Sequence, residues 1–99
     1  MSGGDKVFEQ ELLQILKLEF PKELKELKLN FKAKNFEKVT LDIHKIKHKI
    51  GLLGMADSLE FASKVEYDIK KGITEEYDDL LLILDRIAVY LSHKQLTLL

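Results

Sequence analysis

Apolar residues recur at alternating intervals of three and four along most of this 99-residue chain, and this spacing constrains the fold more than any other feature. Such a period places the apolar side chains on one face of an α-helix, whereas a half-buried strand would alternate at every second residue. The clearest stripe consists of Val39, Ile43, Ile46, Ile50 and Leu53. Later stripes consist of Ala62, Val65 and Ile69, and of Leu80, Leu84, Ile87 and Leu91. Because no segment has the alternation of a strand, the pattern predicts an all-α protein.

Pro21 divides the N-terminal third of the chain in this interpretation. Asp5 is a good N-cap for a first helix that ends at about Glu19. Its expected apolar stripe consists of Phe8, Leu12, Ile15 and Leu16. A second helix, with Leu24, Leu27 and Phe31 on its apolar face, is expected to start at Pro21, since proline suits the first helical position. Residues 1–4 are expected to form a flexible tail.

Capping residues predict three more helices toward the C-terminus. Their expected starts are Asn35 for a helix over residues 36–53, Asp57 with Glu60 as a capping box, and Thr74. The short connections favour antiparallel neighbours. We therefore expect one domain over residues 1–99, an antiparallel four-helix bundle from Pro21 onward with an additional N-terminal helix.

The composition narrows the classes of function. The net charge is −1, so no overall positive field attracts nucleic acid or an anionic membrane. The chain has no cysteine, which excludes disulfides, thiolate metal sites and a cysteine nucleophile. No apolar run approaches the roughly 18 residues of a membrane span, and the N-terminus lacks the apolar region of a secretory signal. We expect a cytoplasmic monomer.

The residues most suggestive of chemistry lie between Asp42 and Gly54. At about 100° per residue, His44 lies roughly 130° from the centre of the apolar stripe and therefore faces solvent. A neutral imidazole is a good nucleophile near pH 7, because the ordinary pKa of histidine is about 6.5. A phosphorylated imidazole gains negative charge, which Lys47 and Lys45 are placed to offset. The pattern predicts a phosphoryl acceptor.

Apolar residues near this histidine suggest a docking surface. Leu41, Leu52 and Met55 are expected to form a minor apolar strip beside His48. Gly51 would leave the backbone open to a partner on the same side of the helix. A glycine inside a helix costs close to about 1 kcal/mol relative to alanine, so it calls for a packing or access reason.

Two other interpretations stay open for the histidine. An exposed histidine on a charged helix is usually only a solvated residue. His44 and His48 are four residues apart, which can also place both imidazoles on one metal ion. Position 45 is lysine rather than the glutamate of a zinc-protease motif, and Lys45, Lys47 and Lys49 would repel a dication. The sequence therefore predicts no metal site.

The segment His44-Lys45-Ile46-Lys47, with Leu53-Gly54 nine and ten residues after the histidine, resembles the signature of histidine-containing phosphotransfer (HPt) domains. In that family the histidine is followed by any residue, then leucine or isoleucine, lysine and glycine, with leucine or phenylalanine and a glycine at the same later offset. Lys34-Asn35-Phe36 resembles the break before the family's active-site helix. The resemblance covers about residues 21–91.

The resemblance implies a phosphocarrier built on an antiparallel four-helix core, and not an enzyme by itself. It implies that His44 takes a phosphoryl group from a receiver aspartate, or from a kinase, and passes it to another receiver aspartate. Lys47 would stabilise the phosphoryl group, and Glu66 would bond the inner ring nitrogen of the histidine and orient it. The chain has no Gly-rich phosphate loop, so no ATP site is expected.

The implied partners are a response-regulator receiver domain, a hybrid histidine kinase, or both. The expected partner-binding residues are Leu41, Lys45, His48, Gly51, Leu52 and Met55. No cofactor is expected for this chain, and Mg²⁺ would come only with the receiver.

One position departs from the family pattern. The family has glycine directly after the lysine, whereas this chain has His48, one helical turn from His44. The larger side chain would crowd an approaching receiver, although it could also act as a second acceptor or a docking residue. The departure leaves open a non-catalytic helical adaptor that binds a receiver without phosphotransfer. A histidine-dependent metal-binding bundle is the third hypothesis.

Overall fold

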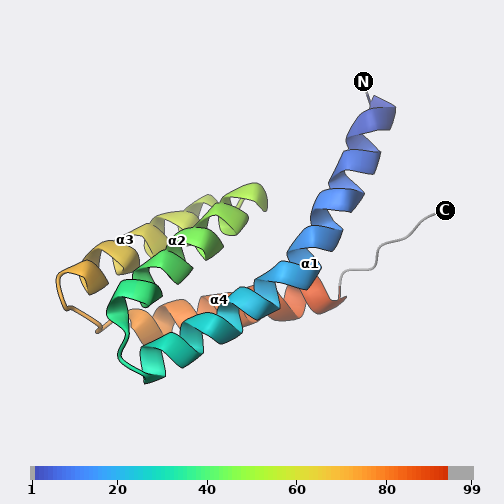
Figure 1. Ribbon diagram of the computed structural model, residues 1–99. Helices are drawn as coiled ribbons and strands as arrows, with labels where there is room; N and C mark the ends of the chain where they lie inside the picture. Colours follow the sequence, from blue (N-terminus) through green and yellow to red (C-terminus); the bar gives the residue numbers. More distant parts are fainter. Residues whose placement is uncertain (1, 94–99) are drawn as a thin grey trace.

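The computed structural model describes residues 2–93, with side chains from Val7 onward, and this part of the chain contains four helices and no strand. The helices are α1 (Ser2–Lys32), α2 (Phe36–Leu52), α3 (Ala56–Lys70) and α4 (Tyr77–His93). Helix α1 packs against α2 and α4, and α3 packs against the same two helices (Figure 1). The result is a bundle-like arrangement around one core. Among the described helices, none is long and apolar enough to cross a membrane.

The expected division at Pro21 is wrong, because α1 continues through this residue and no additional N-terminal helix exists in the described chain. A proline inside a helix removes one hydrogen-bond donor and bends the helix. Figure 1 shows α1 changing direction between its N-terminal and C-terminal parts. Pro21 is exposed, whereas Leu16, Phe20 and Leu24 are buried in the common core. This shared burial holds both parts of the chain in one helix.

The helix α1 includes most of the segment that was expected to form a flexible tail. Residues 2–4 belong to α1, whereas Met1 lies outside the described residues. In the expected N-terminal stripe, Leu16 is buried and Leu12 partly buried, but Phe8 and Ile15 are 63% and 48% exposed. Figure 1 shows the N-terminal end of α1 extending beyond the other three helices.

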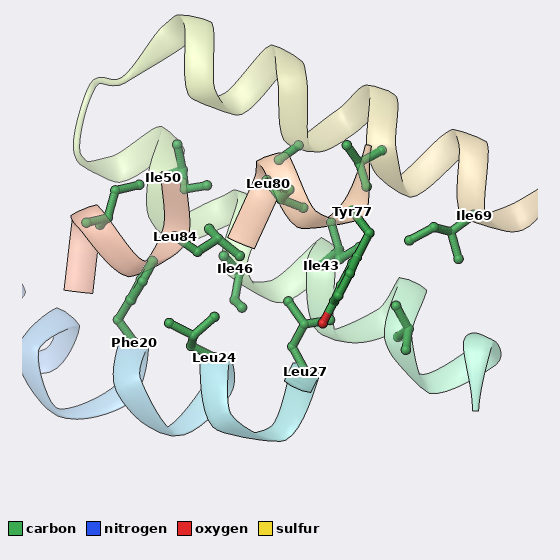
Figure 2. Packing of buried hydrophobic residues seen from close by; sticks show 14 of the residues in the cluster. Phe20, Leu24, Leu27, Ile43, Ile46, Ile50, Ile69, Tyr77, Leu80 and Leu84 are labelled. Atoms are coloured by element: carbon green, nitrogen blue, oxygen red, sulfur yellow. The ribbon is translucent and has the colours of Figure 1, made fainter. Parts of the chain in front are cut away.

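The stripes predicted for the other helices form the core (Figure 2). The buried members are Val39, Ile43, Ile46 and Ile50 from α2, Ala62, Val65 and Ile69 from α3, and Leu80, Leu84, Ile87 and Leu91 from α4. Leu53 is only partly buried, against the edge of this cluster. Tyr77 was not predicted to be in the core, yet it is buried and stacks on Phe31 with 3.5 Å between ring centroids. The apolar period alone thus located most of the buried surface.

The ends of the helices show which capping predictions hold. The Asn35 side chain accepts a hydrogen bond from the Lys38 backbone N–H at 3.4 Å, which confirms it as the N-cap of α2. The capping box at Asp57 is wrong, because α3 begins at Ala56 and Asp57 lies in its first turn. The helix expected to start at Thr74 begins later, because the first residue of α4 is Tyr77.

A tight turn joins α2 to α3 and sets α3 beside the helix that carries His44. Gly54 has a φ of +76°, a backbone conformation that favours glycine. The Met55 N–H then donates to the Ile50 carbonyl at 3.3 Å, which closes the turn. The chain therefore reverses within a few residues, and α3 runs back along α2.

Candidate functional site

His44 lies on the exposed side of α2, as the helical geometry predicted. Its side chain is 52% exposed, whereas its neighbours Ile43 and Ile46 are buried in the core. Regular apolar spacing fixes which face of α2 turns inward, and the imidazole is left at the surface.

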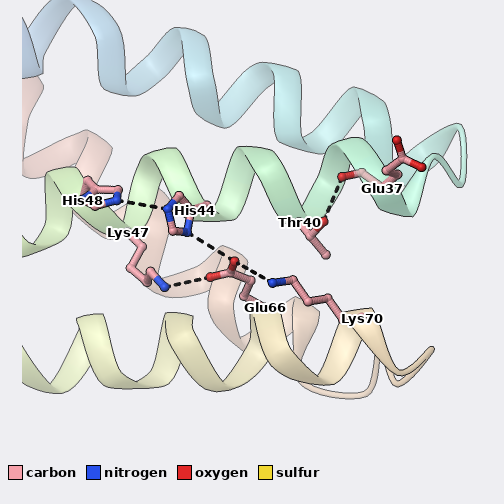
Figure 3. Close-up of polar contacts among 7 residues, drawn as sticks. All are labelled: Glu37, Thr40, His44, Lys47, His48, Glu66 and Lys70. Atoms are coloured by element: carbon pink, nitrogen blue, oxygen red, sulfur yellow. Dashed lines mark hydrogen bonds and ion pairs between the residues drawn. The ribbon is translucent and has the colours of Figure 1, made fainter.

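Glu66 extends from α3 toward this histidine (Figure 3). Its Oε2 lies 3.4 Å from Nδ1 of His44, and its Oε1 accepts a hydrogen bond from Nζ of Lys47 at 2.9 Å. Nζ of Lys70 lies 3.5 Å from Oε2. The structure thus brings together His44, Lys47 and Glu66. Lys70 was missed, although its spacing of four residues from Glu66 on one helix could have indicated the pair.

The Glu66 carboxylate is held in its charged form although its side chain is only 8% exposed. Burial by itself raises the pKa of Glu66, but the hydrogen bond from Lys47, the positive charges of Lys47 and Lys70, and the electrostatic effect of the nearby His44 lower it below its ordinary value overall. An ionised carboxylate only accepts hydrogen bonds. It therefore favours the His44 tautomer with the proton on Nδ1 and the lone pair on Nε2.

His48 occupies the other side of the same imidazole. Its Nε2 lies 3.2 Å from Nε2 of His44, and the two rings meet nearly edge to face, with centroids 4.7 Å apart and planes at 78°. The sequence indicated that His48 would crowd a receiver that approaches His44, but not that the outer nitrogens of the two histidines would meet. Both nitrogens of His44 therefore have polar neighbours, a carboxylate at Nδ1 and an imidazole at Nε2 (Figure 3).

The expected partner-binding residues lie at the surface of the protein. Leu41 and Leu52 are 59% and 58% exposed, and Met55 is 37% exposed. Lys45 is exposed and, with Leu41, lines a cavity of about 340 Å³ bordered also by α1 residues.

Gly51 is exposed, and its lack of a side chain is not required by packing. A Cβ atom at this position would meet Leu59 Cδ2 at 3.6 Å, an ordinary van der Waals distance. Packing therefore does not explain this glycine, and access of a partner to the helix surface is the expected reason that stays untested.

The lysines of this helix are tied to carboxylates of neighbouring helices. Lys47 bonds Glu66 on α3, and Lys49 bonds Glu23 on α1 at 2.9 Å and Glu19 at 3.2 Å. Burial by itself lowers the pKa of Lys49, but these two glutamates raise it overall. Two of the three lysines that were expected to repel a dication are thus balanced by acidic partners. Within residues 2–93, however, no group of three or more His, Cys, Asp or Glu side chains could hold a metal ion.

Comparison with known proteins gives no relative for this chain: no family model matches it, and no curated protein or solved structure shows significant similarity to it.

Proposed function

We propose that this protein is a phosphocarrier of the HPt type, which accepts a phosphoryl group on Nε2 of His44 and passes it to a receiver aspartate. The observation that carries the proposal is the Glu66 carboxylate placed against Nδ1 of an exposed histidine. A carboxylate at the inner nitrogen raises the basicity of the outer one, as it does for histidines that bind metals. The motif around His44 and the four-helix arrangement support the same proposal.

The transfer step follows from this tautomer. The Nε2 lone pair attacks the phosphorus of an acyl phosphate on a receiver aspartate. The N–P bond forms, the P–O bond breaks, and its electron pair leaves on the receiver's carboxylate. His44 keeps the proton on Nδ1, so the positive charge that develops on the ring faces Glu66 at 3.4 Å. Transfer to a second receiver reverses the same step.

Lys47 has a secondary part in this proposal. Its Nζ is bound to Glu66, and its side chain is 21% exposed, so it can share its charge between the carboxylate and a phosphoryl group on His44. An exposed charge pair contributes at most about 1 kcal/mol until a partner excludes water. Receiver docking on the strip around Leu41, Leu52 and Met55 would supply that exclusion, and Mg²⁺ would come with the receiver.

The proposal is tested by incubation with a set of phosphorylated receiver domains, followed by mapping of the label. The wild-type chain should gain a label that is labile in acid and stable in base. His44→Gln should abolish the label, whereas His48→Gln should retain it, and His93→Gln serves as the matched control for an exposed histidine elsewhere. Label that survives in His44→Gln would refute the assignment of the site.

The second candidate function is a non-catalytic adaptor that binds a receiver domain. The observation in its favour is the contact of His48 with the outer nitrogen of His44, at the position where the family has glycine. An adaptor would bind receivers in titration calorimetry without ever gaining label. His44→Gln would then leave the affinity for the receiver unchanged.

A further inference from the structure

The contact between the two imidazoles has a chemical meaning beyond crowding. Nε2 of His48 and Nε2 of His44 are 3.2 Å apart, within hydrogen-bond distance, and only one of these nitrogens can carry the proton between them. Glu66 favours the proton on Nδ1 of His44, which leaves the lone pair on Nε2. The donor of the bond is therefore Nε2–H of His48, and its acceptor is the lone pair that would attack phosphorus.

We propose that His48 is a positioning residue that caps the resting nucleophile and, after transfer, donates the same N–H to the phosphoryl group. The inference deepens the proposed function and rests on it. A lone pair that accepts a hydrogen bond cannot form the N–P bond at the same time, so His48 must turn away before attack. His48 is exposed, and exposed side chains change rotamer within picoseconds to nanoseconds. The hydrogen bond from His48 therefore limits the phosphorylation rate through the fraction of His44 whose lone pair is free, and not through the speed at which His48 turns away.

The phosphorylated state offers this donor a better acceptor. A phosphoryl group on Nε2 of His44 places its oxygens in the space that the His48 N–H now faces. Hydrogen bonds to an anionic oxygen are roughly twice as strong as those between neutral groups. The exchange of acceptors therefore favours the phosphorylated form. A glycine at this position would supply neither the shield for the resting histidine nor this hydrogen-bond donor for its phosphoryl group.

The size of both effects follows from one exposed hydrogen bond. The net contribution of such a bond changes an equilibrium by about two- to tenfold. Removal of the His48 imidazole should therefore speed phosphorylation of His44 by about this factor and shorten the lifetime of its phosphoryl group by a similar or larger factor.

The test uses phosphoramidate, a small donor whose P–N bond breaks to release ammonia, so that receiver docking does not enter the measurement. Rates of gain and loss of label at His44 are measured in the wild type, His48→Ala and His48→Gln, with His93→Ala as the matched control. His48→Ala should show faster gain and faster loss. His48→Gln carries an amide N–H and should restore part of the wild-type behaviour. The nitrogen-15 resonance of His44 Nε2 should move in His48→Ala as the hydrogen bond is lost.

Equal or slower labelling in His48→Ala, or an unchanged His44 Nε2 resonance, would overturn this inference. Loss of label at the wild-type rate in His48→Ala would also overturn it. The proposed function fails in a different way, when no phosphorylated receiver labels His44 although phosphoramidate does. The two failures are thus distinguishable, because the small donor reports on the imidazole pair alone.

Discussion

Replacement of Glu66 by glutamine should destabilise the protein and slow phosphorylation, because the substitution removes one buried charge and keeps the shape of the side chain. Lys47 then loses the partner of its 2.9 Å bond, and Lys70 and His44 lose a nearby negative charge. A hydrogen bond to a charged group contributes about 1.5–3 kcal/mol, and the partial exposure of the lysines reduces this value. We expect a loss of about 1 kcal/mol in the free energy of unfolding, or about 4–8 °C in melting temperature for a chain of this size.

The destabilisation should depend on pH in a defined direction. Because the pKa of Glu66 is lowered in the folded state, its charge stabilises the fold above the ordinary glutamate pKa of about 4.3. That stabilisation is lost as the pH falls through the lower pKa of the folded protein. Urea unfolding should therefore separate wild type from Glu66→Gln at pH 7, and the difference should shrink toward pH 3.

The effect of this substitution on phosphorylation should be modest. The 3.4 Å between Glu66 and Nδ1 of His44 is longer than the roughly 2.7–2.9 Å of a strong charge-assisted bond, and the histidine is half exposed. We expect labelling by a receiver to slow by about three- to tenfold, consistent with a bond of about 1 kcal/mol. Glu60→Gln, an exposed glutamate of the same helix, is the matched control. Wild-type stability and wild-type labelling in Glu66→Gln would together refute the reasoning.

Three further predictions concern the core, the glycine and the imidazole pair. The Tyr77 hydroxyl is buried with no hydrogen-bond partner among the described residues, and burial, with nearby acidic residues, raises its pKa to about 12. Tyr77→Phe should therefore leave the free energy of unfolding unchanged or raise it by up to about 1 kcal/mol. A clear loss of stability in urea unfolding would contradict this prediction. Gly51→Ala should raise the melting temperature, because alanine favours a helix by about 1 kcal/mol and its Cβ meets Leu59 at an ordinary distance; a lower melting temperature would count against it. The Nε2 atoms of His44 and His48 are 3.2 Å apart, a spacing that suits two ligands of one tetrahedral zinc ion with Zn–N bonds of about 2.0–2.1 Å. Zn²⁺ should therefore inhibit phosphorylation of the wild type more than that of His48→Ala. Equal inhibition of the two would argue against chelation by this pair.

The sequence predicted α2, α3 and α4 well because each has a complete apolar face and polar flanks. It failed at Pro21, where a local rule for helix starts competed with the burial of Leu16, Phe20 and Leu24 in one core. It failed at Asp57 because the backbone turn through Gly54 starts α3 before the expected cap. Rules for helix starts that use only neighbouring residues do not include tertiary packing, which can override them.

Some features of the candidate site were likewise predictable from the sequence, and others were not. The relation of His44 to Lys47 follows from helix geometry alone, and the exposure of the histidine was predicted from it. The position of Glu66 depends on how α3 packs against α2, and it was expected only through the family resemblance. The 3.2 Å contact with His48 needed side-chain rotamers, which no periodicity contains.

The ion pairs of Lys47 and Lys49 restrict rotation of α2 about its own axis. Lys47 is bound to α3 through Glu66, and Lys49 is bound to α1 through Glu23 and Glu19. The close-packed apolar face of α2 sets its orientation, and these ion pairs add a weaker restraint on its two flanks. The direction in which the His44 side chain faces is therefore supported from both sides by neighbouring helices, and loss of either ion pair should widen the range of orientations of this side chain.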